Sequence, residues 1–526
     1  MDNWDIYSKA LKYYEEKNYD EALAILEELK RLSPDYKKTY MLESLIWKDL
    51  KNFSKEAAVL KFLLGKFDIS SPDEKDYVVH ILKRLCKISS EVCLNDIFVK
   101  SAYLMSKLTE YKSQNTAYIS LSDAMLIANA IENFSAEDFR ALYDEYKKYF
   151  AEIKPYPKKF YNHEKIRVGF MSADFKNHTV MTWSWALLTR LDKNFFRIYC
   201  YSNVDTPNKV TNYLSSMVDG WRDIHDLTDE EVAKIIRDDE IDILFDLSGH
   251  TAGTRLSVAA YRPASVQISG IGYMNSTGLD AIDYFLSDVY CAGNSEKYFT
   301  EKLLILPHSH ICYEAPTKYE PAANPPCLKN NFVTFGSFNR FIKMTDSTLT
   351  VWKKIMDSVP DSRLILKQNT YNTVKDKNFV GNRLSSFGFD LSRVEMRPYS
   401  SDWLLQYADV DIALDTFPYT GGVTTCEALY MGVPVISLYG DRHGTRFGLS
   451  ILSNVGLNEL AVDSYDEYIK RAVALAGDWE LLKILRKNLR IMMKKSPLTD
   501  AEGYVREVEK AFAKILSDER EKFSSK

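Results

Sequence analysis

Residues 409–434, DVDIALDTFPYTGGVTTCEALYMGVP, combine a buried strand, a glycine-containing loop and the start of a helix. The short apolar run 412–414 is typical of a strand buried in a parallel sheet. In the loop 420–425, small residues and hydroxyls precede a helix start, where free N–H groups and the positive dipole end favour an anion. Glu427, one turn later, is placed to reach a ribose diol. The stretch predicts a seat for a nucleoside diphosphate, and its alternative is an ordinary strand-to-helix turn.

Length and composition limit the classes of protein. The 526 residues exceed what one hydrophobic core supports, so we expect two to four domains. The net charge of -5 gives no global reason to bind nucleic acid or an anionic membrane. The 7 cysteines form no CxxC pair, and no histidine stands at metal-ligand spacing, so we expect reduced thiols without disulfides or structural zinc. No apolar run is long enough to span a membrane, and we expect a soluble, cytoplasmic protein.

The first 150 residues are nearly free of glycine and have apolar residues at helical spacing. Aligning KNYDEALAILEEL with KNFSKEAAVLKFLL sets Tyr19 against Phe53, 34 residues apart, which is the period of a tetratricopeptide repeat (TPR). We expect a TPR-like helical domain over residues 1–155 whose concave face holds an acceptor protein or peptide. The alternative is a structural cap on the rest of the chain.

A doubly wound α/β lobe is expected after the prolines near residue 155. Apolar strands at 166–171, 196–201 and 241–247 alternate with helical segments. The loops SADFKNHT and DLSGHTAGT follow the first and third of these strands and should line one crevice. We place this lobe at residues 160–318.

A second proline-rich passage precedes another α/β lobe, expected at residues 328–495. Its strands are predicted at FVTFGS, RLILK, RVEMRP, the run 412–414 and PVISLYG. The chain ends in helices, and we expect the segment 496–526 to pack back on the two lobes.

The motifs of the second half, in their order, closely resemble the O-GlcNAc transferase and SPINDLY family of glycosyltransferases. The LDTFPY strand end, the Thr-rich loop, the acidic residue and the LYMGVP helix carry this resemblance, which extends from about residue 166 to about residue 498. It implies the GT-B architecture, two facing Rossmann-like lobes, here preceded by an all-α TPR-like domain. It also implies a nucleotide sugar as donor and a protein as acceptor.

The resemblance assigns donor-binding residues. A leaving nucleoside diphosphate develops negative charge, which a metal or fixed protein groups must meet. No DxD-like pair stands at a strand end of the second lobe, so we expect protein groups alone and no metal. Lys343, in SFNRFIKMTDST, matches the family lysine that contacts the diphosphate. The expected donor-binding set is Asn339, Arg340, Lys343, Gly422, Val423, Thr424, Thr425 and Glu427.

Three residues of the first lobe are candidates for the base that accepts the proton of the acceptor hydroxyl. His178 matches the histidine of the family's DFxxH motif, and a near-neutral imidazole suits this role. His250, in SGHTAG, is a rival, and Asp246 is a further candidate base or a residue that orients a histidine. The sequence does not select one of them.

Four positions depart from the family pattern. Gly270 stands where relatives have tryptophan, and Met274 and Asn275 replace a Pro-Gly pair. Ser401 stands where relatives tend to have histidine. The first three bear on acceptor and sugar preference more than on fold or reaction, and the fourth on a phosphate or base contact.

These inferences together predict an inverting, metal-independent glycosyltransferase that moves GlcNAc from UDP-GlcNAc to Ser or Thr of a protein, without a cofactor. The alternatives are O-fucosyl transfer from GDP-fucose, as in the SPINDLY branch, and hexosyl transfer to asparagine of an adhesin-like protein. Outside this class stand a nucleotide-sugar epimerase and a non-enzymatic TPR scaffold. The sequence leaves the oligomeric state open, an oligomer included.

Overall fold

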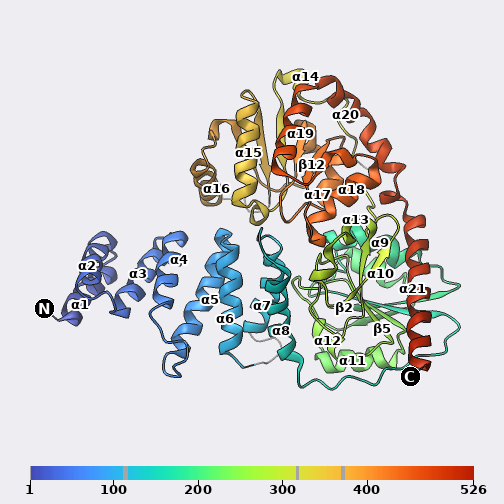
Figure 1. Ribbon diagram of the computed structural model, residues 1–526, viewed down its shortest axis with the longest axis horizontal. Helices are drawn as coiled ribbons and strands as arrows, with labels where there is room; N and C mark the ends of the chain where they lie inside the picture. The colour runs from blue at the N-terminus through green and yellow to red at the C-terminus, as the bar shows by residue number, and fades with distance from the viewer. Residues whose placement is uncertain (1, 111–115, 316–318, 369–373, 526) are drawn as a thin grey trace. The chain divides into compact units, whose positions relative to one another are not determined.

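The computed structural model describes residues 2–110, 116–315, 319–368 and 374–525. The chain divides into two compact units, residues 1–128 and 129–526. The described part of the first unit is helical, and the second unit contains two parallel sheets (Figure 1). This confirms the predicted α/β class with a helical N-terminal region.

The first unit is a series of helices that pack on their sequence neighbours. Helices α1 and α3 begin at Asn3 and Lys37, and α2 and α4 at Tyr19 and Phe53, so both pairs repeat after 34 residues. Small and aliphatic side chains such as Ala22 fill the core between the first helices. The helices of this unit are α1 (Asn3–Glu15), α2 (Tyr19–Leu32), α3 (Lys37–Asp49), α4 (Phe53–Leu64), α5 (Lys75–Val92), α6 (Asn95–Leu108) and α7 (Thr116–Ala128).

The second unit begins with a lobe built on a seven-stranded parallel sheet of order β3-β2-β1-β4-β5-β6-β7. The strand order reverses between β1 and β4, which makes this the switch point where ligands of doubly wound sheets bind. The strands are β1 (Ile166–Ser172), β2 (Phe196–Ser202), β3 (Gly220–Asp223), β4 (Ile243–Asp246), β5 (Val266–Ser269), β6 (Tyr284–Asp288) and β7 (Lys302–Leu306).

The other lobe has a six-stranded parallel sheet of order β10-β9-β8-β11-β12-β13, with its switch point between β8 and β11. Its strands are β8 (Thr334–Ser337), β9 (Arg363–Lys367), β10 (Val394–Arg397), β11 (Ile412–Leu414), β12 (Val435–Leu438) and β13 (Ala461–Val462). The helices of the two lobes are α9 (Thr179–Arg190), α10 (Lys209–Ser215), α11 (Asp229–Asp238), α12 (Leu256–Ala260), α13 (Val289–Ala292), α14 (Cys327–Asn330), α15 (Asp346–Ser358), α16 (Val374–Ser386), α17 (Val423–Tyr430), α18 (Phe447–Val455), α19 (Tyr465–Gly477) and α20 (Trp479–Lys494).

Two further helices of the second unit pack on the first lobe. The last helix, α21 (Ala501–Ser524), runs along this lobe (Figure 1), where the rings of Phe512 and Phe245 lie 6.1 Å apart. Helix α8 (Ala136–Lys147), which we expected in the N-terminal helical domain, belongs to the second unit, and its Tyr143 hydroxyl donates to the Tyr298 carbonyl at 3.2 Å.

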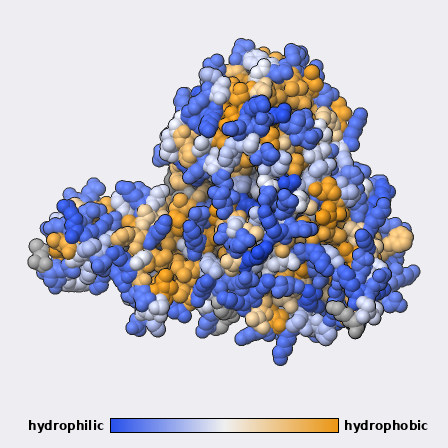
Figure 2. All heavy atoms as spheres, viewed as in Figure 1, coloured by the Kyte–Doolittle hydropathy of each residue, from blue (hydrophilic) through white to orange (hydrophobic). Residues whose placement is uncertain are grey.

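Within the described residues, no helix is both long and apolar enough to cross a bilayer. Figure 2 shows hydrophilic residues over much of the visible face, with apolar patches between them.

Candidate active site

The predicted donor-binding residues lie at the switch point of the second lobe. Strands β8 and β11 are adjacent and parallel, with Phe335 opposite Ile412. Asn339 and Lys343 follow β8, and the loop 415–422 follows β11. Because the carboxyl ends of parallel strands meet at one edge of a sheet, the two segments flank the same crevice.

Lys343 is held in this crevice by the loop after β11. Its Nζ donates to the Thr420 carbonyl at 2.9 Å and lies 3.9 Å from the centre of the Tyr419 ring. The residue as a whole is partly exposed, but protein atoms surround its amine. This desolvation lowers the pKa of Lys343 to about 8; the Asp415 carboxylate opposes the shift, and the exposed Arg340 adds to it.

Asp415, at the end of β11, shapes the loop that holds Lys343. Its Oδ1 accepts the N–H groups of Gly421 at 2.7 Å and Thr416 at 2.9 Å, and its Oδ2 accepts the Ser437 hydroxyl at 2.7 Å. Burial raises the pKa of Asp415, and the hydrogen bonds and the charge of Lys343 oppose this rise. Our sequence reasoning missed this residue, although the LDT motif contained it.

Helix α17 begins directly after the loop. The N–H groups of Thr425 and Cys426 both turn back to the Gly422 carbonyl at 3.1 Å. The first N–H groups of a helix have no intrahelical acceptors. Among the described residues, the N–H groups of Val423 and Thr424 are therefore available to donate to an anion.

Thr424 ties the helix start to the segment after β8. Its hydroxyl donates to Asn339 Oδ1 at 3.1 Å. A side chain at Gly421 would collide with the hydroxyls of Thr424 and Thr425, because its Cβ would lie 2.7 Å from each Oγ1. The loop therefore needs glycine for this close approach.

Glu427 lies on α17, partly exposed. Its Oε1 accepts the Trp403 indole N–H at 2.8 Å. Burial raises the pKa of Glu427 to about 7, and the bond from Trp403 opposes this shift. Trp403 lies 24 residues earlier, outside the motif, and sequence reasoning missed it as a partner.

In the first lobe, His178 and Asp174 follow β1. His178 caps α9, and its side chain is 45% exposed. Its Nδ1 lies 3.4 Å from the Val180 nitrogen and 3.4 Å from Asp174 Oδ2. In the first contact Nδ1 accepts the Val180 N–H, and the second is an ion pair only when the ring is protonated. Burial raises the pKa of Asp174.

Asp246 is the last residue of β4 and His250 follows this strand, across the switch point from His178. His250 is fully buried and its Nε2 lies 2.9 Å from the Thr277 carbonyl oxygen. Burial lowers its pKa to about 4, so the ring is neutral at pH 7 and its Nε2–H donates to that carbonyl. Asp246 accepts the Gly249 N–H and the Ser269 hydroxyl, each at 2.8 Å, and thereby shapes the loop.

The two lobes approach each other at these loops. A Cβ on Gly422 would lie 3.4 Å from the Trp183 indole, which is on α9 behind His178. The rings of His250 and Tyr273 meet edge-on at 5.2 Å, and Tyr419 contributes to the raised pKa of Tyr273, after burial. The loops of the two lobes therefore contact each other here.

The four positions that depart from the family pattern all make contacts within the second unit. Asn275 is buried and donates to Asn129 Oδ1 at 3.2 Å. The Met274 carbonyl lies 3.2 Å from His443 Nδ1, a contact between the lobes. A Cβ on Gly270 would lie 3.1 Å from Leu286 Cβ, so a larger side chain there requires the strand to shift. Ser401 accepts the Tyr319 hydroxyl through its carbonyl at 3.3 Å.

A pocket of about 520 Å³ opens near the same loop, but it contains none of the predicted donor-binding residues. It is lined by Glu132, Asn133, Phe134, Ser135, Tyr298, Phe417, Pro418, Leu438, Tyr439, Gly440, Asp441, Arg442, Thr445 and Tyr465. We therefore treat it as separate from the diphosphate seat.

Residues 145–317 and 323–508 match the family described as Glycosyl transferase family 41. The chain belongs to this family. It is thus, by family, a glycosyltransferase, which confirms the predicted class. Similar curated proteins are the SPINDLY probable UDP-N-acetylglucosamine-peptide N-acetylglucosaminyltransferases of Hordeum vulgare, 38% identical over 353 residues, and Arabidopsis thaliana, 37% identical over 355 residues.

Both matches extend over 66% of the family 41 chain. They cover only 37% of the barley protein and 39% of the Arabidopsis protein, so the chain spans less than half the length of these relatives. A solved structure of the Thermobaculum terrenum O-GlcNAc transferase, in a variant with one lysine replaced by methionine, is similar over 98% of both chains, with a TM-score of 0.78 and 26% identity. This likeness confirms the GT-B architecture behind a helical N-terminal region.

Proposed function

We propose that this family 41 chain is an inverting protein glycosyltransferase that transfers GlcNAc from UDP-GlcNAc to Ser or Thr without a metal ion. The observation that carries the proposal is the position of Lys343. Its buried amine lies at the switch point of the second lobe, where it donates to the carbonyl of Thr420, three residues before α17 begins. The SPINDLY relatives are named as probable UDP-N-acetylglucosamine-peptide N-acetylglucosaminyltransferases, which supports the proposed donor and peptide acceptor.

The leaving diphosphate is proposed to lie between Lys343 and the N-terminus of α17. There the ammonium group and the N–H groups of Val423 and Thr424 meet the charge that develops as the glycosidic bond breaks. Arg340, exposed beside Lys343, adds positive charge at the mouth of the crevice. The ribose hydroxyls donate to the Glu427 carboxylate.

On the opposite side, the base is proposed to come from the first lobe. Inversion requires one displacement, with the acceptor hydroxyl attacking the anomeric carbon from the face away from the diphosphate. His178, with Asp174 at 3.4 Å, suits the removal of its proton because the imidazole is accessible. The buried His250 already donates its Nε2–H to the Thr277 carbonyl. We therefore assign His250 to positioning the loop that contains Thr277.

We expect nucleotide binding to report on Glu427. Replacing Glu427 by Gln removes a charged hydrogen-bond acceptor, so the Kd for UDP should rise roughly 10–100-fold. Because the pKa of this carboxyl is raised to about 7, wild-type affinity should increase from pH 6 to pH 8 as the carboxylate ionises, and the variant should lose this dependence. Isothermal titration calorimetry with UDP measures both effects.

Trp403→Phe is the matched variant for this experiment. It removes the N–H that stabilises the ionised carboxylate, so the pH midpoint of UDP binding should move upward. Parallel titrations with GDP test the GDP-fucose alternative: tighter binding of GDP than of UDP favours that donor. If Glu427→Gln leaves the affinity for both nucleotides unchanged, Glu427 does not hold the ribose.

Metal independence has a structural argument of its own. The sequence Asp409-Val-Asp411 directly precedes β11. It therefore lies at the amino-terminal end of this strand, whereas the crevice lies at the carboxyl end. Asp409 pairs with Arg397 at 2.7 Å, and Asp411 accepts the N–H groups of Cys327 and Thr334. These carboxylates are therefore engaged away from the diphosphate.

We expect sugar transfer to continue in EDTA at the rate found with added Mg²⁺ or Mn²⁺. The protein groups that meet the diphosphate charge are unaffected by chelation. Initial rates with and without chelator, followed by addition of each ion, test this. Loss of activity in EDTA that Mg²⁺ or Mn²⁺ restores would show that a hard cation takes part in the reaction.

A further inference from the structure

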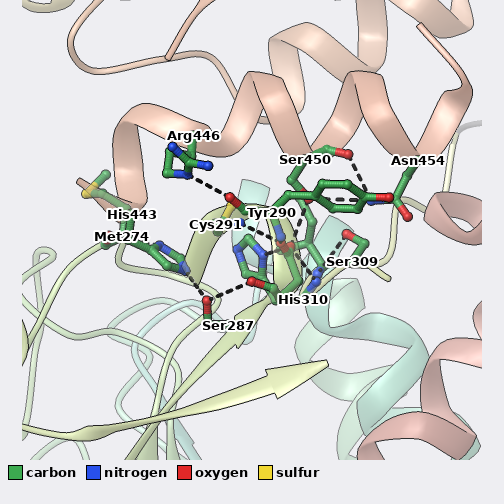
Figure 3. Close-up of polar contacts among 12 residues, drawn as sticks. Met274, Ser287, Tyr290, Cys291, Ser309, His310, His443, Arg446, Ser450 and Asn454 are labelled. Atoms are coloured by element: carbon green, nitrogen blue, oxygen red, sulfur yellow. Dashed lines mark hydrogen bonds and ion pairs between the residues drawn. The ribbon is translucent and has the colours of Figure 1, made fainter. Parts of the chain in front are cut away.

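Three potential metal ligands meet where the two lobes contact each other, outside the crevice described above. Cys291 on α13 and His310 after β7 come from the first lobe, and His443 comes from the loop after β12. All three are buried, and one ligand atom from each lies within 4.8 Å of the others. Figure 3 shows this Cys-His cluster beneath α18.

Both histidines are oriented by an acceptor on the Nδ1 side. His310 Nδ1 lies 2.5 Å from Asp288 Oδ2, and His443 Nδ1 lies 3.2 Å from the Met274 carbonyl oxygen (Figure 3). A carboxylate or backbone carbonyl that holds Nδ1–H fixes the tautomer whose Nε2 lone pair is available to a metal. The cluster already has this arrangement for both rings.

The Nε2 atom of His310 has no hydrogen-bond partner among the described residues, although it is buried. A buried polar atom without a partner costs free energy unless something absent from the protein chain satisfies it. His443 Nε2 lies 3.0 Å from the Ser287 hydroxyl, which can also hold a water molecule beside a metal ion.

A zinc ion at this place would meet two negative charges, those of the Cys291 thiolate and of the Asp288 carboxylate behind His310. Arg446, whose Nε donates to the Tyr290 carbonyl at 2.7 Å, adds one positive charge beside the cluster.

We propose that the Cys-His cluster binds one zinc ion, which ties the first lobe to the second. Cys291 Sγ, His310 Nε2 and His443 Nε2 are its protein ligands, and a water molecule beside Ser287 takes the fourth position. Zn–N bonds of about 2.0 Å and a Zn–S bond of about 2.3 Å place tetrahedral ligand atoms roughly 3.3–3.5 Å apart. The three ligand atoms now lie within 4.8 Å of one another, so on binding they would approach each other by at most about 1.5 Å.

This site is independent of the proposed sugar transfer. Its sulfur and nitrogen ligands select zinc rather than Mg²⁺ or Mn²⁺, which prefer oxygen. The sequence predicts no structural zinc because the three ligands are far apart along the chain and belong to different lobes, so no ligand spacing reveals them.

The test measures metal content by inductively coupled plasma mass spectrometry on the untagged full chain, purified from zinc-supplemented medium. We expect about one zinc ion per chain in the wild type and at least a tenfold loss in Cys291→Ser. Cys200→Ser is the matched control, because Cys200 is fully buried in the first lobe but lies outside the cluster. This control should keep its zinc.

Cobalt substitution of the wild type gives a second readout that needs no variant. Co²⁺ bound at the Cys-His cluster should show a thiolate-to-cobalt charge-transfer band in the near ultraviolet, which added Zn²⁺ abolishes. A wild-type chain that holds no zinc and shows no such band overturns the proposal. So does equal zinc content in Cys291→Ser and Cys200→Ser.

Discussion

Replacing Lys343 by methionine is expected to lower kcat on the order of 10²–10³-fold, because removal of one group that meets developing negative charge has costs of this size. The change keeps most of the side-chain volume over the Tyr419 ring and removes the amine that donates to the Thr420 carbonyl at 2.9 Å. Steady-state kinetics with UDP-GlcNAc and a peptide acceptor measure the loss, and thermal unfolding measures stability.

Lys367→Met is the matched control. Lys367 is a buried lysine of the second lobe, and its Nζ donates to the Pro398 carbonyl at 2.7 Å. Because its amine contacts Pro398 and Ser400 and not the loop after β11, its loss should lower stability more than kcat. Near-normal kcat in Lys343→Met, or an equal loss of kcat in both variants, would remove Lys343 from the proposed chemistry.

The pH dependence of the wild type should carry the signature of Lys343. Its pKa in the free protein is lowered to about 8, so the amine is charged at pH 7 and loses its charge above pH 8. We therefore expect kcat/KM to fall above pH 8. The bound diphosphate favours the ammonium form, so kcat should fall only at higher pH. If kcat and kcat/KM fall at the same alkaline pH, this assignment is contradicted.

Deleting residues 1–128 is expected to abolish modification of full-length proteins but to spare short peptides. The deletion removes one compact unit and leaves the unit that contains both sheets. If the helical unit holds the acceptor protein, its loss lowers the effective concentration of the acceptor site, on the order of 100-fold or more for a protein substrate. Transfer to a short peptide should stay within about tenfold of the full chain.

Two outcomes would contradict this role of the helical unit. An insoluble deletion variant would favour the alternative that the helices cover apolar surface of the first lobe. A soluble variant with full activity on an intact protein acceptor would exclude both roles and direct attention to oligomerisation.

Much of the fold can be predicted from the sequence, because apolar runs bounded by turn residues identify strands such as β1, β9 and β11. Strands β5 and β6 are harder to predict. They lie in the run RPASVQISGIGYMNSTGLDAIDYFLSD, where buried serines and glutamine interrupt the apolar pattern. In the structure the Gln267 amide nitrogen donates to the Ala259 carbonyl at 2.9 Å, and the Ser269 hydroxyl donates to Asp246 at 2.8 Å.

The candidate site also has residues that the sequence can indicate and others that it cannot. Lys343, Thr424 and Glu427 stand in motifs, so the sequence can indicate them. Their partners come from other segments of the chain, and no local sequence pattern identifies them. The Trp403 indole donates to Glu427, and the Thr420 carbonyl accepts from the Lys343 amine. The pKa values depend on these contacts and on burial, which only the folded chain defines.

The central claim, a protein glycosyltransferase that uses UDP-GlcNAc at the Lys343 site, is tested most directly by mass spectrometry of acceptor proteins. The full chain is incubated with lysate of its own cells and either UDP-GlcNAc or GDP-fucose, beside Lys343→Met. We predict N-acetylhexosamine on Ser or Thr of lysate proteins with UDP-GlcNAc and the wild type only. Absence of any transferred sugar, or equal transfer by Lys343→Met, would contradict the claim.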